Sequence, residues 1–243
     1  MRLLLASDLH YVLPQLDWLL DQAPVFDAVV LAGDLLDVSS AVPLETQIVV
    51  VRNYVNKLAG SATAIVCSGN HDLTASNGHG EKSAMWIEQV GGSGAVVDWQ
   101  TFDVENTRIT VCPWWDGPFT RGDVDRQLET EAVDRPLRWV WIYHYPPDAS
   151  PVSWTGKRHI GDPDLNGWIE QHRPDLVLTG HIHDSPFRDG GSWQARVGAT
   201  AVINAGRAPG PIPAHAIVDT VAGTADWWSP YGRDSVELWP AAP

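Results

Sequence analysis

Cysteine, basic residues and long hydrophobic runs are all scarce in this sequence. The 243 residues include only two cysteines, Cys67 and Cys112, so we expect no disulfide framework and a reducing, cytoplasmic location. The 16 Lys and Arg against 30 Asp and Glu give a formal net charge of −14, which leaves no basic surface for long nucleic acids. No apolar run approaches the ~20 residues that cross a bilayer, so no membrane partner is expected.

The composition is that of an ordinary globular protein, with 44% hydrophobic and 19% charged residues. No internal repeat, low-complexity tract or linker divides the chain, so we predict one domain over residues 1–243. The 13 tryptophans scatter from Trp18 to Trp239, and most are expected to pack in the core or at its rim.

Short apolar runs alternate with amphipathic stretches over the first ninety residues, which predicts consecutive βα units and a parallel sheet. The pattern then changes to short β-like runs, where we expect antiparallel strands. The predicted strands are 3–6, 28–32, 64–67, 95–97, 101–104, 107–112, 139–143, 176–179, 193–197, 199–203, 214–218 and 224–228. The predicted helices are 13–20, 42–58, 81–90, 123–132 and 164–172. The fold class is therefore α/β.

Side chains that commonly bind metals follow strand after strand, where the apolar runs end. They form five groups: Asp8 and His10; Asp34 and Asp37; Asn70, His71 and Asp72; His144; and His181 and His183. Each group alone is typical of a helix cap, a turn or a hydrogen-bonded histidine. Because ligands bind at the carboxyl ends of strands in open α/β sheets, we expect the five groups to converge into one site.

In this order the groups resemble the signature of the calcineurin-like metallophosphoesterases, which is D-x-H, G-D-x-x-D, G-N-H-D/E, a single H, and G-H-x-H. The resemblance spans residues 8–183, and looser matches to small stand-alone bacterial members lie at 111–115, 144–147 and 202–206. The family resemblance implies a two-sheet β-sandwich flanked by helices, a four-layer αββα arrangement.

Carried over by position, the resemblance implies two metal sites that share one aspartate. The implied ligands are Asp8, His10 and His183 for one ion, Asn70, His144 and His181 for the other, and Asp34 as the bridge. His71 would be the catalytic histidine and Asp37 would orient it, while Asp72 has no settled direct role. Imidazole and oxygen ligands without thiolate suit two divalent ions such as Mn, Fe, Zn, Co or Ni.

The function implied is hydrolysis of a phosphate ester by a hydroxide held between the ions. A protein phosphatase would continue its second block with Arg-Gly, whereas Val38 and Ser39 follow Asp37 here. The first hypothesis is a phosphodiesterase acting on a small diester, with cyclic nucleotides as candidates. The alternatives are a phosphomonoesterase acting on a small metabolite or nucleotide and a non-catalytic scaffold of the same fold. The scaffold is disfavoured because such relatives typically lose metal ligands or the catalytic histidine, whereas every matched position is intact here.

Further residues near the five groups are candidates for substrate contact. They are His79, Lys82, Arg158, His159 and Arg207, together with Trp114 and Trp115 as an aromatic wall. For the two tryptophans, ordinary packing is the competing interpretation. His172 and His215 lie outside the groups and are expected to be structural.

Overall fold

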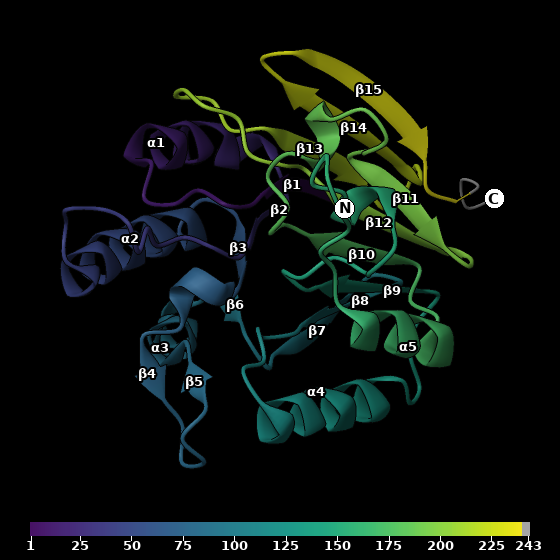
Figure 1. Ribbon diagram of the computed structural model, residues 1–243, viewed down its shortest axis with the longest axis horizontal. Helices are drawn as coiled ribbons and strands as arrows, with labels where there is room; N and C mark the ends of the chain where they lie inside the picture. The colour runs from purple at the N-terminus through teal and green to yellow at the C-terminus, as the bar shows by residue number, and fades with distance from the viewer. Residues whose placement is uncertain (240–243) are drawn as a thin grey trace.

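Two mixed β-sheets lie face to face in the middle of the molecule, and helices cover both outer faces (Figure 1). The structure is a computed structural model that describes residues 1–239. In sheet order, the first sheet contains β15 (Gly232–Glu237), β14 (Thr224–Ser229), β13 (His215–Asp219), β1 (Arg2–Ala6), β2 (Ala28–Ala32), β3 (Thr63–Cys67) and β6 (Val96–Val97). The second contains β11 (Gln194–Val197), β12 (Thr200–Asn204), β10 (Leu176–Thr179), β9 (Arg138–Ile142), β8 (Thr107–Val111) and β7 (Thr101–Val104).

The central strands of each sheet run parallel. In the first sheet β1, β2, β3 and β6 are parallel neighbours, and in the second β8, β9, β10 and β12 are. Strands β13, β14 and β15 extend the first sheet by antiparallel pairing, while β7 and β11 form the antiparallel edges of the second. The carboxyl ends of the parallel strands therefore meet at common edges, as α/β binding sites require.

Helices pack on the outer face of each sheet. The α-helices are α1 (Leu13–Gln22), α2 (Leu44–Ala59), α3 (Met85–Val90), α4 (Pro118–Glu131) and α5 (Pro163–His172). Single turns of 3₁₀-helix lie at Ala23–Val25, Asn70–Asp72, Gly91–Ser93, Pro151–Ser153 and Ser185–Phe187, and a small hairpin is formed by β4 (Ala75–Ser76) and β5 (Lys82–Ser83). Figure 1 shows α1, α2 and α3 beside the first sheet and α4 and α5 beside the second. The order of layers is helix, sheet, sheet, helix, as the family resemblance implies.

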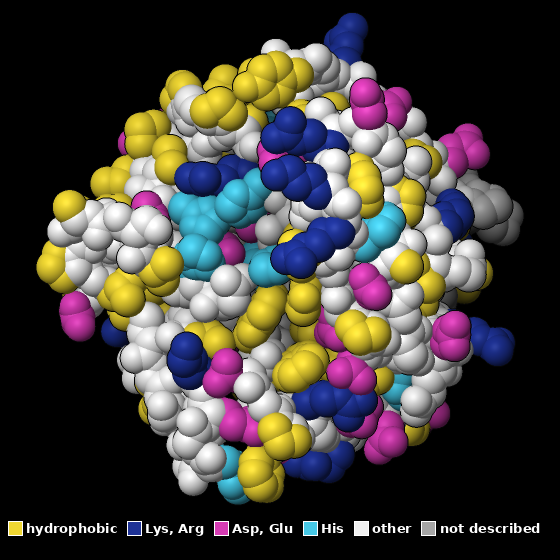
Figure 2. All heavy atoms as spheres, viewed as in Figure 1, with side chains coloured by type: hydrophobic (Ala, Val, Ile, Leu, Met, Phe, Trp, Pro, Cys, Tyr) yellow, Lys and Arg dark blue, Asp and Glu magenta, His cyan; other side chains and the backbone are white. Residues whose placement is uncertain are grey.

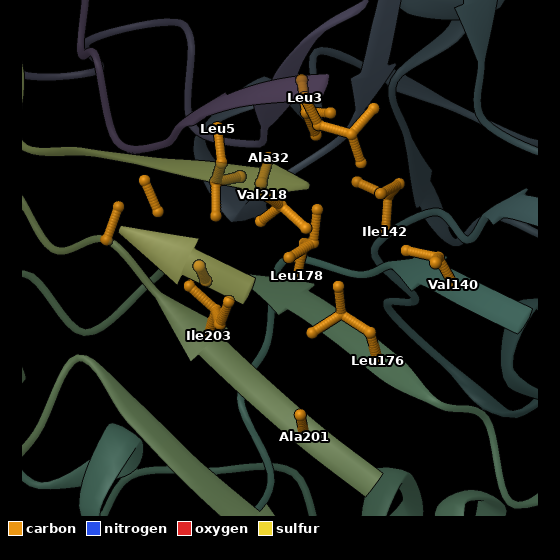
Figure 3. Packing of buried hydrophobic residues seen from close by; sticks show 14 of the residues in the cluster. Leu3, Leu5, Ala32, Val140, Ile142, Leu176, Leu178, Ala201, Ile203 and Val218 are labelled. Carbon is orange, nitrogen blue, oxygen red and sulfur yellow. The ribbon is translucent and has the colours of Figure 1, made fainter. Parts of the chain in front are cut away.

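The alternation of side chains along the strands divides the core into three layers. Leu3 and Leu5 on β1 point between the sheets, where they pack with Leu178 and Ile203 of the second sheet (Figure 3). Leu4 points the other way, into the layer beneath α1 and α2. A third cluster lies under α4 and α5 on the far face of the second sheet.

Most predicted elements are present, with shifts at their ends. The predicted helix at 81–90 is shorter, because Lys82–Ser83 pairs with Ala75–Ser76 and the helix begins only at Met85. Strand β15 was not predicted, because its sequence of mostly polar, exposed residues has no apolar alternation. Among the described residues no helix combines the length and hydrophobicity that a membrane span needs.

We expect truncation of the central core to lower the free energy of unfolding. Leu178 is fully buried between the sheets, so Leu178→Ala should cost about 2–5 kcal/mol, measured by urea unfolding of chelator-treated protein. Leu137→Ala provides the control, because that side chain is 62% exposed and should change stability by less than about 0.5 kcal/mol. Equal losses in the two variants would contradict the assignment of the central core.

Candidate metal centre

The predicted ligands converge where strands of both sheets end. Asp8 follows β1, Asp34 follows β2 and Asn70 follows β3, so the first sheet supplies one side of the site. His144 follows β9 and His181 follows β10, and these strands belong to the second sheet. Figure 2 shows histidine side chains gathered in a hollow of this face, with acidic side chains among them and Lys and Arg side chains around them.

One cluster joins Asp8, His10, Asp34 and His183, whose ligand atoms all lie within 4.8 Å of one another. The Nε2 atoms of His10 and His183 are 3.0 Å apart, and Nε2 of His183 is 3.2 Å from a carboxylate oxygen of Asp8. A carboxylate oxygen of Asp34 lies 3.8 Å from Nε2 of His10. Four potential ligand atoms thus surround a space of the size that one cation occupies.

A second cluster joins Asp34, His144 and His181 under the same distance limit. Nε2 of His144 lies 3.4 Å from Oδ2 of Asp34, and Nδ1 of His181 lies 2.9 Å from the side-chain oxygen of Asn70. Asp34 belongs to both clusters. The structure therefore brings together all seven side chains that the resemblance named as ligands, with Asn70 joined to the second cluster through its contact with His181.

The donor atoms suit divalent cations. Nδ1 of His144 donates to the carbonyl oxygen of Ala32 at 2.6 Å, which leaves Nε2 as the ligand atom of the neutral ring. That Nε2 is buried and has no hydrogen-bond partner among residues 1–239. An orphaned buried nitrogen beside two carboxylates is costly unless a cation or a proton satisfies it.

Burial and the carboxylates shift the pKa values of the histidines in opposite directions. Burial is the main cause that lowers the pKa of His10 and of His181, to about 4 in each case, so both rings are neutral at physiological pH. Burial would also lower the pKa of His144, but the charges of Asp34 and Asp8 raise it to about 9. Without a cation His144 therefore holds a proton, which a metal ion must displace.

The backbone conformation directs the candidate ligands toward the centre. Asp8, Asp34 and His181 have φ values of 55°, 55° and 69°, a left-handed conformation that residues with a side chain seldom adopt. A Cβ at Gly33 would collide with the His144 ring, and one at Gly69 would collide with the carboxylate of Asp34. These glycines allow the loops after β2 and β3 to approach the ligands closely.

Two buried residues brace the ligand loops without reaching the clusters. The Asp72 carboxylate accepts backbone N–H groups of Leu35, Leu36 and Gly69, and so joins the loop of Asp34 to the loop of Asn70. The Asn204 amide donates to the carbonyl of Ile182, between the two ligand histidines of that loop. The sequence predicted only an indirect role for Asp72 and no separate role for Asn204, although both lie within matched segments.

His71 lies directly beside the clusters. Its backbone N–H donates to Asp34 at 2.8 Å, and its ring centroid is 4.6 Å from that of His10. The predicted partner Asp37 accepts the N–H of Ser39 instead, and Nδ1 of His71 has no hydrogen-bond partner among the described residues. The structure brings His71 to the centre, but the His71 ring donates no hydrogen bond to Asp37, because Asp37 is held in its own turn.

The other candidate residues fall into two classes. Trp114 stacks on Tyr145 at 4.8 Å, and both rings pack against His181, so this pair forms a wall beside the second cluster. Arg207 lines a cleft beside His183. The rest make other contacts: Trp115 donates to Asp162, His79 stacks on Phe119, His159 hydrogen-bonds with Ser150, and Lys82 and Arg158 are bound through their backbone N–H groups.

Comparisons with known proteins identify the family of the chain. Residues 1–185 match the model of the calcineurin-like phosphoesterase family, and the chain belongs to that family. It is accordingly a metal-dependent phosphoric ester hydrolase, whose Asp and His clusters are the candidate sites for divalent ions. No curated protein sequence matches the chain.

Several solved structures share the fold at low sequence identity. The protein TT1561 of Thermus thermophilus is 14% identical with a TM-score of 0.61, and the match covers 98% of this chain and 99% of that one. Purple acid phosphatase PPD1 of yellow lupin is 11% identical with a TM-score of 0.58, over 98% of this chain and 51% of that one. A dimetal phosphatase of Danio rerio is 10% identical with a TM-score of 0.55, over 99% and 97%.

We predict that the ion-free protein loses stability as the pH rises from about 7 to about 8.5. The pKa of His144 is about 9 in the folded state against 6.5 ordinarily, so across this window the folded state holds a proton that the unfolded chain has mostly lost. Asp72 and Asp98, whose pKa values burial raises to about 7, finish titrating near its lower end. The measurement is the free energy of urea unfolding in chelator at both pH values.

The matched control for this measurement is His144→Gln, which cannot titrate. Its stability should fall much less across the same window, because only Asp72 and Asp98 still titrate there, near pH 7. A wild-type protein that is equally stable at both pH values would contradict the raised pKa of His144.

Proposed function

We propose that the protein hydrolyses a small phosphodiester at two divalent ions bridged by Asp34. The observation that carries this proposal is the membership of Asp34 in both ligand clusters. A carboxylate with one oxygen near His10 and the same oxygen near His144 is placed to hold two cations side by side. We take Asp8, His10 and His183 as ligands of the first ion, and Asn70, His144 and His181 as ligands of the second.

The chain's own side chains have separate tasks in this reaction. When bound, the two ions neutralise phosphate charge, clamp its oxygens and lower the pKa of an attacking water. His71 is fixed beside the centre by its backbone bond to Asp34, and its Nε2, 3.9 Å from that carboxylate, is placed to give a proton to the leaving oxygen. Its side chain is 26% exposed, so substrate can reach it.

The charge of the adjoining cleft favours a diester over a monoester. Arg207 and Asp184 line this cleft beside His183, and Asp184 is also paired with Arg188 at 3.1 Å. Arg207 is therefore the cation of this cleft that has no ion pair among residues 1–239. A diester carries one negative charge, whereas a monoester carries nearly two at neutral pH. One unpaired cation matches the single charge of a diester, and cyclic nucleotides are among the diesters.

The setting we propose is the cytoplasm, with a small phosphorylated substrate and no long nucleic acid. Cys67 and Cys112 are free and buried, and burial raises the pKa of both thiols, which suits a reducing compartment. The net charge of −14 opposes extended polyanions but leaves a metal site free to bind one phosphate.

Removal of the proton donor should lower turnover without removing the ions. His71→Ala is expected to reduce kcat by about 10²–10⁴-fold while the bound metal, measured by elemental analysis, stays unchanged. His79→Ala is the control, since that exposed ring stacks on Phe119 and should retain full activity. Full activity of His71→Ala would remove His71 from the mechanism.

The reaction class is tested with bis(p-nitrophenyl) phosphate beside p-nitrophenyl phosphate. The protein is stripped by chelator, reloaded with Mn, Fe, Zn, Co or Ni in turn, and assayed with both substrates. We expect hydrolysis only after reloading, with a higher kcat/KM for the diester. A higher value for the monoester would make the protein a phosphomonoesterase, and no turnover with any ion would favour the non-catalytic scaffold.

A further inference from the structure

An apolar pocket of about 630 Å³ lies close to the metal centre, between α1, the loop before β13 and strand β14. Its lining is mostly aromatic, aliphatic and proline side chains: Trp18, Pro209, Pro211, Ile212, Pro213, His215, Trp228, Ser229 and Pro230. A pocket of this size holds a ring system, and apolar walls with few polar groups are typical of small-molecule sites.

The pocket adjoins the cleft at the metal centre. The cleft measures about 250 Å³ and is lined by the ligand His183 as well as by Arg207, while Pro209 lines both cleft and pocket. The loop between them is held in place, because Gln15 of α1 donates to the carbonyls of Ala208 and Gly210 at 2.9 Å each. A molecule that is bound at His183 and long enough to pass Pro209 would therefore reach a preformed pocket.

Arg207 supplies the charge at the start of this path. Its backbone N–H donates to the carbonyl of His183 at 3.0 Å, which fixes it next to the first ligand cluster. Its guanidinium forms no hydrogen bond or ion pair with any residue in the range 1–239. A free guanidinium beside a phosphate-binding centre is suited to pair with a phosphate oxygen.

The far end of the path offers His215 as a hydrogen-bond acceptor among mostly apolar walls. His215 is only 9% exposed, and its ring packs against Trp18 with centroids 4.7 Å apart. Its Nδ1 donates to the carbonyl of Pro213 at 2.9 Å, and burial lowers its pKa, so the ring is neutral and Nε2 is an acceptor. No residue among those described hydrogen-bonds to that Nε2.

We propose that this pocket binds the organic group of the substrate, and that this group consists of a polar spacer next to phosphorus and a flat ring with an N–H donor. The spacer occupies the cleft at Arg207, and the ring lies among Trp18, Ile212 and Trp228 with its donor on His215. The inference rests on the proposed phosphodiesterase function and specifies its substrate class. The proposal predicts a higher kcat/KM for substrates that carry the ring, although the ring lies away from the reacting phosphorus.

Two chromogenic diesters test the ring requirement. Thymidine 5′-(p-nitrophenyl phosphate) carries a polar spacer and a ring with an N–H donor, and tetrahydrofurfuryl p-nitrophenyl phosphate carries a similar spacer without the ring. For Mn-reloaded wild-type protein we expect kcat/KM to be at least about tenfold higher for the thymidine ester, as burial of one ring-sized apolar group provides. Equal values for the two esters would overturn the proposal.

The pocket itself is tested by a charge placed in its wall. Ile212→Asp should reduce the ratio of the two kcat/KM values to near one while turnover of the ring-free ester stays unchanged. Val221→Asp is the matched control, because Val221 is 58% exposed, Ile212 is 46% exposed, and Val221 lies outside the pocket. A ratio that Ile212→Asp leaves at the wild-type value would place the ring elsewhere and overturn the proposal.

Binding to chelator-stripped protein separates this inference from the proposed function. Calorimetry should give a Kd for the thymidine ester that is about tenfold lower than for the ring-free ester, and Ile212→Asp should abolish the difference. This preference without hydrolysis after reloading would retain the pocket and reject the phosphodiesterase. Equal binding of both esters, or a dimer in sedimentation that Ile212→Asp dissociates, would reject the pocket as a ligand site.

Discussion

The sharing of the Asp34 carboxylate between two ligand clusters is the constraint around which the rest of the structure is arranged. Each cluster combines residues from both sheets, so the sheets must meet with their strand ends in register for Asp34 to reach His10 on one side and His144 on the other. The parallel central strands make this meeting feasible, because they end at a common edge. The central core of Leu, Val and Ile side chains holds the two sheets at that spacing.

Formation of the centre is unfavourable for the free energy of folding, and hydrogen bonds of the surrounding loops offset this. Left-handed backbone at Asp8 and Asp34 is strained, and burial of two carboxylates beside His144 is unfavourable without a cation. Buried hydrogen bonds from Asp72 and Asn204 fix the loops that carry the ligands. The site is thus preorganised in the folded chain before an ion binds. Ion binding should in turn raise the free energy of unfolding.

The sequence predicted the layers, and it singled out the side chains that the fold brings together at the candidate site, because both depend on short patterns. Apolar runs mark buried strands, and the residues that follow them are the candidate ligands, as at Asp8 and His181. Contacts between distant segments were harder to predict. The isolation of Asp37 from His71 and the pairing of Lys82–Ser83 with Ala75–Ser76 depend on how loops pack, which no local pattern specifies. The pocket at Ile212 likewise arises only when α1, the loop before β13 and strand β14 meet.

The most direct test of the shared carboxylate is anomalous diffraction from crystals of the Mn-reloaded protein. The account predicts two anomalous peaks, one among Asp8, His10 and His183 and the other among Asn70, His144 and His181. Both peaks would lie within bonding distance of Asp34. A single peak, or two peaks that do not share Asp34, would contradict the two-ion centre on which the proposed reaction depends.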